Sequence, residues 1–133
     1  MNGYHENIET LTADNADFRR VLYTGKTLQL VLMTLQPGEE IGAEVHDDRD
    51  QFFRFEEGEG AVDIDDHSHQ VSDGSGVVVP AGARHNVRNT GSAPLKLYTL
   101  YGPPEHQDGI TQATKADAEA RHRDEEWDGG TTE

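Results

Sequence analysis

The sequence contains no cysteine and little apolar material. The absence of cysteine excludes disulfides, thiolate metal ligands and cysteine nucleophiles. Apolar residues make up only 33% of the 133 residues, and no apolar run approaches the ~20 residues that a membrane helix needs. The first 14 residues are polar and acidic, unlike a secretory signal. We therefore expect a cytoplasmic protein that binds no membrane.

Basic residues are also scarce. Eleven Lys and Arg face 26 Asp and Glu, which gives a formal net charge of −15. This charge opposes binding to nucleic-acid phosphates. Crowded carboxylates repel one another in a compact state, but at molar salt the Debye length is only ~3 Å and the repulsion is screened. An ordinary acidic protein and a protein of a salt-rich, halophilic cytoplasm both fit this composition, and we favour the second.

The apolar residues that are present gather into short runs between Gly, Pro and Asp residues. Such runs, rich in Val, Leu, Phe and Tyr, are typical of strands bounded by turns. Eight closely spaced strands predict an all-β sandwich or barrel. We expect these strands at residues 20–24, 28–36, 41–47, 51–57, 60–65, 76–79, 84–90 and 94–101.

The flanks of this β region differ from it in composition. An Ala-rich stretch predicts a short helix near 115–126, with Thr114 as its N-cap, and residues 129–133 should fray. We divide the chain into an N-terminal arm, a barrel and a C-terminal segment: 1–18, 19–104 and 105–133.

Four polar residues are candidates for a metal site: Glu44, His46, Gln51 and His85. Glu44 and His46 are two residues apart, so on a strand both side chains point to the same face. Two imidazoles and one carboxylate form a recurrent ligand set for non-haem iron, and the set also suits Mn, Ni or Zn. If the sheet closes, all four side chains share its interior and predict a site for a divalent transition metal.

Other interpretations compete with this one. A single histidine on a strand is more often a structural or exposed residue than a ligand. His67 and His69 lie beside Asp65 and Asp66 and form a second possible cluster, although a solvated loop explains that segment better. We assign Asn89 to a turn rather than to chemistry.

The glycines and the proline around the candidate ligands complete two known motifs. Gly38, Glu44-Val45-His46, Gln51 and Gly58 have the spacing of the first cupin motif, which carries His-x-His and Glu at the ligand positions. Gly74, Pro80-Ala81-Gly82, His85 and Asn89 match the second motif fully. The sequence thus resembles the cupins, and in particular a group of small single-domain cupins named mannose-6-phosphate isomerase-like.

The resemblance implies a double-stranded β-helix, the jelly-roll barrel, with metal ligands at Glu44, His46, Gln51 and His85. The first motif departs from the family at two of these positions. Glu44 replaces a histidine and Gln51 replaces the glutamate, so one carboxylate has changed place with a neutral ligand. The sugar isomerases of that name also use a lysine and an arginine near the metal, and nothing in the sequence places Lys96 there.

Strand parity predicts the walls of the pocket. Phe53 and Phe55 share the parity of Gln51, and Val87 shares that of His85, so these side chains should point inward. We add Tyr98 from the last strand, although the sequence does not decide which phase of that strand faces inward.

Three functions are compatible with these features. The first is a metal-dependent enzyme, either an isomerase with Glu44 or Tyr98 as its base or an oxygenase that holds iron. The second is a sensor that binds a small molecule without turnover, and the third is a metal-free barrel kept for association. Cupins commonly exchange N-terminal arms, so we expect a homodimer through residues 1–18. A metal-binding cupin acting on a sugar- or carbonyl-type small molecule is our first hypothesis.

Overall fold

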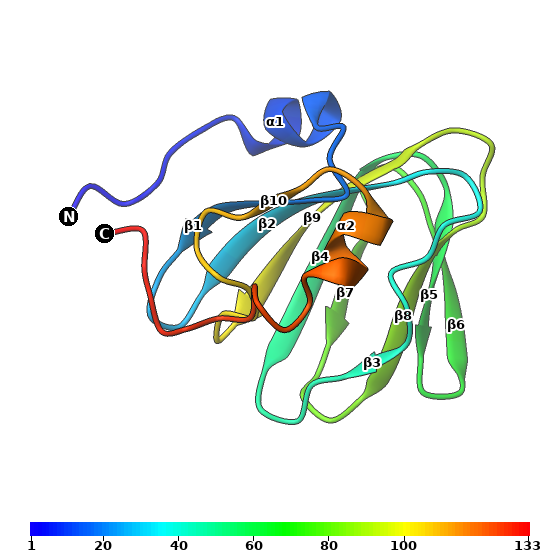
Figure 1. The fold of residues 1–133 in the computed structure, drawn as a ribbon. Helices are drawn as coiled ribbons and strands as arrows, with labels where there is room; N and C mark the ends of the chain where they lie inside the picture. Colours follow the sequence, from blue (N-terminus) through cyan, green and yellow to red (C-terminus); the bar gives the residue numbers. More distant parts are fainter.

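Two antiparallel sheets face one another and enclose the core of the protein (Figure 1). The computed structural model describes residues 1–133. The larger sheet has six strands in the order β10-β1-β2-β9-β4-β7, and the smaller has four in the order β3-β8-β5-β6. The strands are β1 (Arg19–Thr24), β2 (Gln29–Leu35), β3 (Glu44–Val45), β4 (Asp50–Glu57), β5 (Gly60–Ile64), β6 (His67–Val71), β7 (Gly76–Val79), β8 (Arg84–Asn89), β9 (Leu95–Gly102) and β10 (Thr111–Gln112). The all-β prediction is confirmed.

The core lies between the inner faces of the two sheets. Along β4 and β9 buried and half-buried residues alternate, as expected for strands with one face against the core. Phe53 and Phe55 of β4 face Val62 of β5 and Val87 of β8 within one buried cluster. β2 departs from this alternation, since six of its seven residues are buried.

The N-terminal helix α1 (Ile8–Asp14) explains the double-sided burial near β2. It lies against β2, β4 and β9 on the outside of the larger sheet (Figure 1). The Asn7 side chain caps it by accepting a hydrogen bond from Thr10 N at 3.0 Å. This helix was not predicted from the sequence, because it carries few apolar residues. No helix of the chain has the length and apolar character of a membrane span.

The C-terminal segment contains a shorter helix than the sequence predicts, and its last residues are held to the barrel by hydrogen bonds. Helix α2 (Lys115–Ala120) ends six residues before the predicted end at 126. Thr114 caps it as expected, accepting from Asp117 N at 3.1 Å. The prediction that residues 129–133 fray is wrong, because Thr132 N donates to Thr24 O at 2.9 Å.

Two strands, β6 and β10, were not predicted from the sequence. β6 is polar and almost fully exposed, and it forms through backbone pairing with β5. β10 has only two residues and pairs with β1. The predicted strand 41–47 shrinks to β3, with residues 44–45. None of these elements carries the apolar alternation that marks a strand in the sequence.

The turn residues of the two motifs have structural roles. Gly58 has φ +101°, and a Cβ atom there would lie 2.8 Å from Pro94 O, so this tight crossing requires glycine. Asn89 is buried, and its amide nitrogen donates to Leu35 O and Ala93 O, both at 2.9 Å. Its side-chain oxygen accepts from Gly91 N at 2.9 Å, which confirms Asn89 as a turn residue.

We expect Asn89→Ala to destabilise the fold without changing any ligand at the candidate site. The substitution leaves the buried Leu35 carbonyl, the Ala93 carbonyl and the Gly91 amide without their partner, so the free energy of unfolding should fall by about 1–3 kcal/mol. Urea unfolding followed by circular dichroism measures this change. Ser92→Ala, at an exposed position of the same turn, is the control, and an equal effect of both variants would contradict the role of Asn89.

Candidate metal centre

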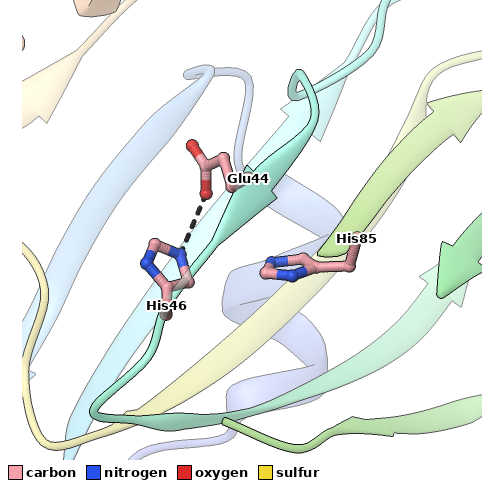
Figure 2. A group of neighbouring side chains, drawn as sticks. All are labelled: Glu44, His46 and His85. Carbon is pink, nitrogen blue, oxygen red and sulfur yellow. Dashed lines mark hydrogen bonds and ion pairs between the residues drawn. The ribbon is translucent and has the colours of Figure 1, made fainter. Parts of the chain in front are cut away.

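The pairing of β3 with β8 brings the candidate ligands together. Glu44 lies opposite His85 in this antiparallel pair, and His46 follows β3 directly. Figure 2 shows the three side chains converging on one point between the strands. One ligand atom from each residue lies within 4.8 Å of the other two. This spacing lets all three bind a single cation.

Short contacts hold each of the three residues. His46 Nε2 lies 3.0 Å from Glu44 Oε2, so the two atoms that would bind a metal already face each other. Gly82 N donates to His46 O at 2.8 Å, and Gly82 has φ +90°, a conformation that favours glycine. The Pro-x-Gly turn of the second motif thereby fixes the first-motif histidine.

The second nitrogen of each imidazole is also engaged. His85 Nδ1 lies 3.1 Å from Ala83 O and donates to it. His46 Nδ1 lies 3.6 Å from Glu105 Oε2. Metal-binding histidines characteristically have a carbonyl or carboxylate at the nitrogen that does not bind the metal. Both histidines therefore present Nε2 toward the centre of the cluster.

Two of the three groups are held in the state that binds a cation, whereas His46 must first give up the proton that it shares with Glu44. Burial opposes ionisation of Glu44, but the hydrogen bond from His46 and the nearby positive charges hold its pKa below the ordinary value. The same hydrogen bond raises the pKa of His46 despite its burial. Burial lowers the pKa of His85, so this ring stays neutral and ready to bind a metal.

Gln51, the fourth candidate ligand, is the first buried residue of β4. Its Nε2 donates to Thr99 Oγ1 at 3.0 Å, while Oε1 is buried without a hydrogen-bond partner. A buried carbonyl oxygen without a partner costs free energy, and a cation would satisfy it. Together with the carboxylate and the two imidazoles, this oxygen gives a donor set that fits a divalent transition metal.

Three of the four predicted pocket residues lie in the interior. Phe53, Phe55 and Val87 are almost fully buried, and the Phe53 ring lies 6.3 Å from that of His85. Tyr98 does not join them. It belongs to the half-buried phase of β9, whereas Thr99 and Tyr101 form the buried phase. Tyr101 therefore replaces Tyr98 beside the candidate site, 6.2 Å from the His46 ring.

A polar group behind His46 was not predicted. Arg49 Nη1 lies 2.6 Å from Glu105 Oε2, and burial raises the pKa of Glu105. His106 is buried, with Nε2 3.3 Å from the Tyr101 hydroxyl. The Gln29 side chain positions this segment, because its Oε1 accepts from the backbone nitrogens of Glu105 and His106 at 3.1 and 3.0 Å.

No local sequence signal marks this group, because the contacts join distant parts of the chain. Only the parity of Thr99 and Tyr101 on β9 could have indicated Tyr101. The alternative cluster at His67 and His69 lies on exposed β6, and its rings stack 6.4 Å apart. Neither residue belongs to the group of three ligands.

With the fold and site in view, comparisons with known proteins place the chain in a family. Residues 31–101 match the Cupin domain family (Cupin_2). That match spans more than half of the chain, so the chain belongs to the cupins. The double-stranded β-helix expected from the motifs is thereby confirmed.

Individual relatives agree with this assignment. The uncharacterized protein YrkC of Bacillus subtilis is 50% identical over 120 residues, which cover 86% of this chain and 64% of YrkC. The chain thus spans just under two thirds of that relative. The uncharacterized protein L612 of Acanthamoeba polyphaga mimivirus is 39% identical, over 80% of this chain and 69% of L612. A crystal structure from Bacillus halodurans has 47% identity and a TM-score of 0.87, over 88% of this chain and 93% of that one.

The buried His106 predicts an acid sensitivity of the metal-free fold. Burial holds the pKa of His106 well below its ordinary value. The unfolded chain therefore binds a proton at this residue first, and stability falls as the pH drops below about 6.5. The contribution is at most about 1.4 kcal/mol per pH unit. In His106→Gln this part of the pH dependence should disappear.

Urea unfolding of the chelator-treated protein between pH 5 and 7.5 checks this. The quantity compared is the slope of the unfolding free energy against pH. His122→Gln, at an exposed position, should keep the slope of the parent protein. Equal slopes in the His106 variant and the parent would contradict the assignment.

Proposed function

We propose that this cupin binds one divalent transition metal through Glu44, His46 and His85 and acts on a small molecule in the barrel. The convergence of the three ligand atoms within 4.8 Å carries this proposal. It is supported by the orientation of both histidines through Nδ1 and by the unpartnered Gln51 Oε1. Two neutral imidazoles, one carboxylate and one amide oxygen leave coordination positions open for a substrate.

The residues around the site have distinct tasks in this proposal. A divalent cation held there supplies Lewis acidity toward a carbonyl or hydroxyl oxygen. Phe53 closes the inner side and excludes water. Glu105 Oε2 pairs with Arg49 and faces His46 Nδ1, so this carboxylate is suited to orient the His46 ring. Burial raises the pKa of Tyr101, which keeps its hydroxyl a hydrogen-bond donor.

Sugar isomerisation of the mannose-6-phosphate type has less support. Lys96 Nζ donates to Asn15 O at 2.7 Å, and Lys96 belongs to the half-buried phase of β9 with Tyr98. The lysine therefore serves the contact with the N-terminal segment. A binding or sensor protein without turnover shares the same site and differs only in the absence of product.

We expect about one equivalent of Fe, Mn, Ni or Zn in protein purified without chelator, and its loss in His46→Ala and His85→Ala. Each substitution removes one of three strong ligands, so the affinity should fall at least tenfold. Metal content by plasma mass spectrometry measures this, and calorimetric titration with Zn²⁺ gives the affinities.

His69→Ala is the matched control because it removes an exposed histidine from β6. It should retain the full metal content. Metal loss in the control as well, or no metal binding by the parent protein after reloading, would refute the metal centre. If metal binds and a small molecule raises the melting temperature without forming product, the protein is a sensor rather than an enzyme.

Gln51→Glu should tighten metal binding. It replaces a neutral oxygen that lacks a partner by a carboxylate, which is a stronger ligand. The Thr99 hydroxyl, which accepts from the Gln51 amide, can rotate to donate to the new carboxylate. We expect about a tenfold gain in affinity for Mn²⁺ and a lower melting temperature of the metal-free variant, because a buried carboxylate then lacks its counter-charge. Gln51→Leu, which removes the oxygen, is the comparison. Equal affinities of the Glu and Leu variants would exclude Gln51 as a ligand.

A further inference from the structure

A cavity lies beside the candidate metal centre, between helix α2 and the barrel. It has a volume of about 280 Å³, and Glu44 forms part of its wall together with Arg19, Lys115 and Glu119. Helix α2 lies over the same end of the barrel as β3 (Figure 1). The volume is near the lower limit of ligand pockets, roughly 300 Å³. It suits a small molecule that reaches the carboxylate of Glu44.

Arg19 is the unusual residue of this cavity. The residue is 7% exposed, and no carboxylate lies within ion-pair distance of its guanidinium. Lys115 differs in this respect, because it is paired with Glu119 at 3.9 Å. A buried positive charge without a counter-charge is costly, and arginine cannot lose that charge. Such a residue is a strong indication of an anion that binds from outside.

The contacts of the guanidinium show which edge is free. Nη1 donates to Gln112 Oε1 at 2.7 Å, and the Cζ atom lies 5.1 Å from the centre of the Phe18 ring. Nε is covered by neighbouring atoms and has no hydrogen-bond partner, and Nη2 makes no hydrogen bond either. A carboxylate that uses both donors therefore requires a small movement of the atoms that cover Nε. Nε and Nη2 form one edge of the planar group, and two parallel donors on such an edge match the two oxygens of a carboxylate.

The guanidinium is also electrostatically close to the metal centre. Burial is the largest influence on the pKa values of Glu44, Tyr101 and His106. The positive charge of Arg19 lowers all three. Glu44 and Glu119 line the same cavity, and their negative charges disfavour a doubly charged group. A singly charged carboxylate therefore fits the site better than a phosphate dianion.

We propose that Arg19 is the anion-recognition residue of this cavity, and that the ligand is a small organic acid. Its carboxylate binds the free edge of the guanidinium, while a hydroxyl or carbonyl oxygen of the same molecule faces the metal centre at Glu44. This assignment rests on the proposed function, since it names the substrate class of that site. Arg19 acts here as a specificity residue.

The test uses the full chain, loaded with Zn²⁺, and titrates it with glycolate, lactate and 3-hydroxybutyrate. These acids place a hydroxyl at different distances from the carboxylate. Calorimetry gives the affinities, and ¹⁵N NMR follows the Arg19 Nε–H signal directly. We expect at least one acid to bind and to shift this signal. Its neutral amide should bind at least tenfold more weakly.

Arg19→Gln should weaken binding of that acid at least tenfold. Arg20→Gln is the matched control, because it removes the same charge from the neighbouring, exposed position of β1, and it should bind within twofold of the parent protein. Equal weakening in both variants, or equal binding of acid and amide, would overturn the proposal. Tighter binding of inorganic phosphate than of every acid would overturn the choice of a carboxylate.

Arg19→Lys keeps the proposal testable if Arg19→Gln does not fold. It retains the charge but loses the two-donor edge, so binding should still weaken several-fold. Affinity equal to that of the parent would refute the two-donor contact. A parallel titration of metal-free protein separates the two proposals. If Zn²⁺ does not bind but acid binding depends on Arg19, only the metal centre fails; if Zn²⁺ binds and acid binding is independent of Arg19, only this inference fails.

Discussion

The candidate site depends on the pairing of β8 with strands on both of its sides. His85 lies opposite Glu44 of β3 on one side and opposite Ile64 of β5 on the other. β3 has only two residues, so most of the ladder that fixes β8 comes from β5. The hydrogen bond from Gly82 N to His46 O then links the second motif to the first. The two-residue strand and the residue after it can therefore carry two ligands, because β8 is itself paired with β5 along five residues.

The inner face of the barrel changes character along its strands. On β9, Leu95 and Leu97 are followed by Thr99 and Tyr101 at the inward positions, and on β4 the inward Gln51 precedes Phe53 and Phe55. The apolar end supplies the buried area that stabilises the fold. The polar end concentrates the groups with shifted pKa values, as functional sites commonly do.

The sequence was sufficient where position follows from strand parity and motif spacing. Glu44 and His46 had to share a face, and the assignment of Asn89 to a turn needed only the motif. It was insufficient where position depends on contacts between distant segments. Tyr98 was misplaced because α1 covers the outer face of β9, so both faces of that strand are apolar and parity gives no direction. Glu105 is placed by a hydrogen bond to Gln29, a residue 76 positions away.

The location of these residues along the chain has one further consequence. All four candidate ligands fall within residues 31–101, the part that matches the cupin domain. Arg19 lies before that part, and its partner Gln112, which itself donates to Glu125 at 3.2 Å, lies after it. Under the two proposals, the metal ligands and the anion-recognition residue thus lie in separate stretches of the chain. Exchange of the flanks between related barrels would then alter which molecule is selected while the central domain keeps its metal ligands.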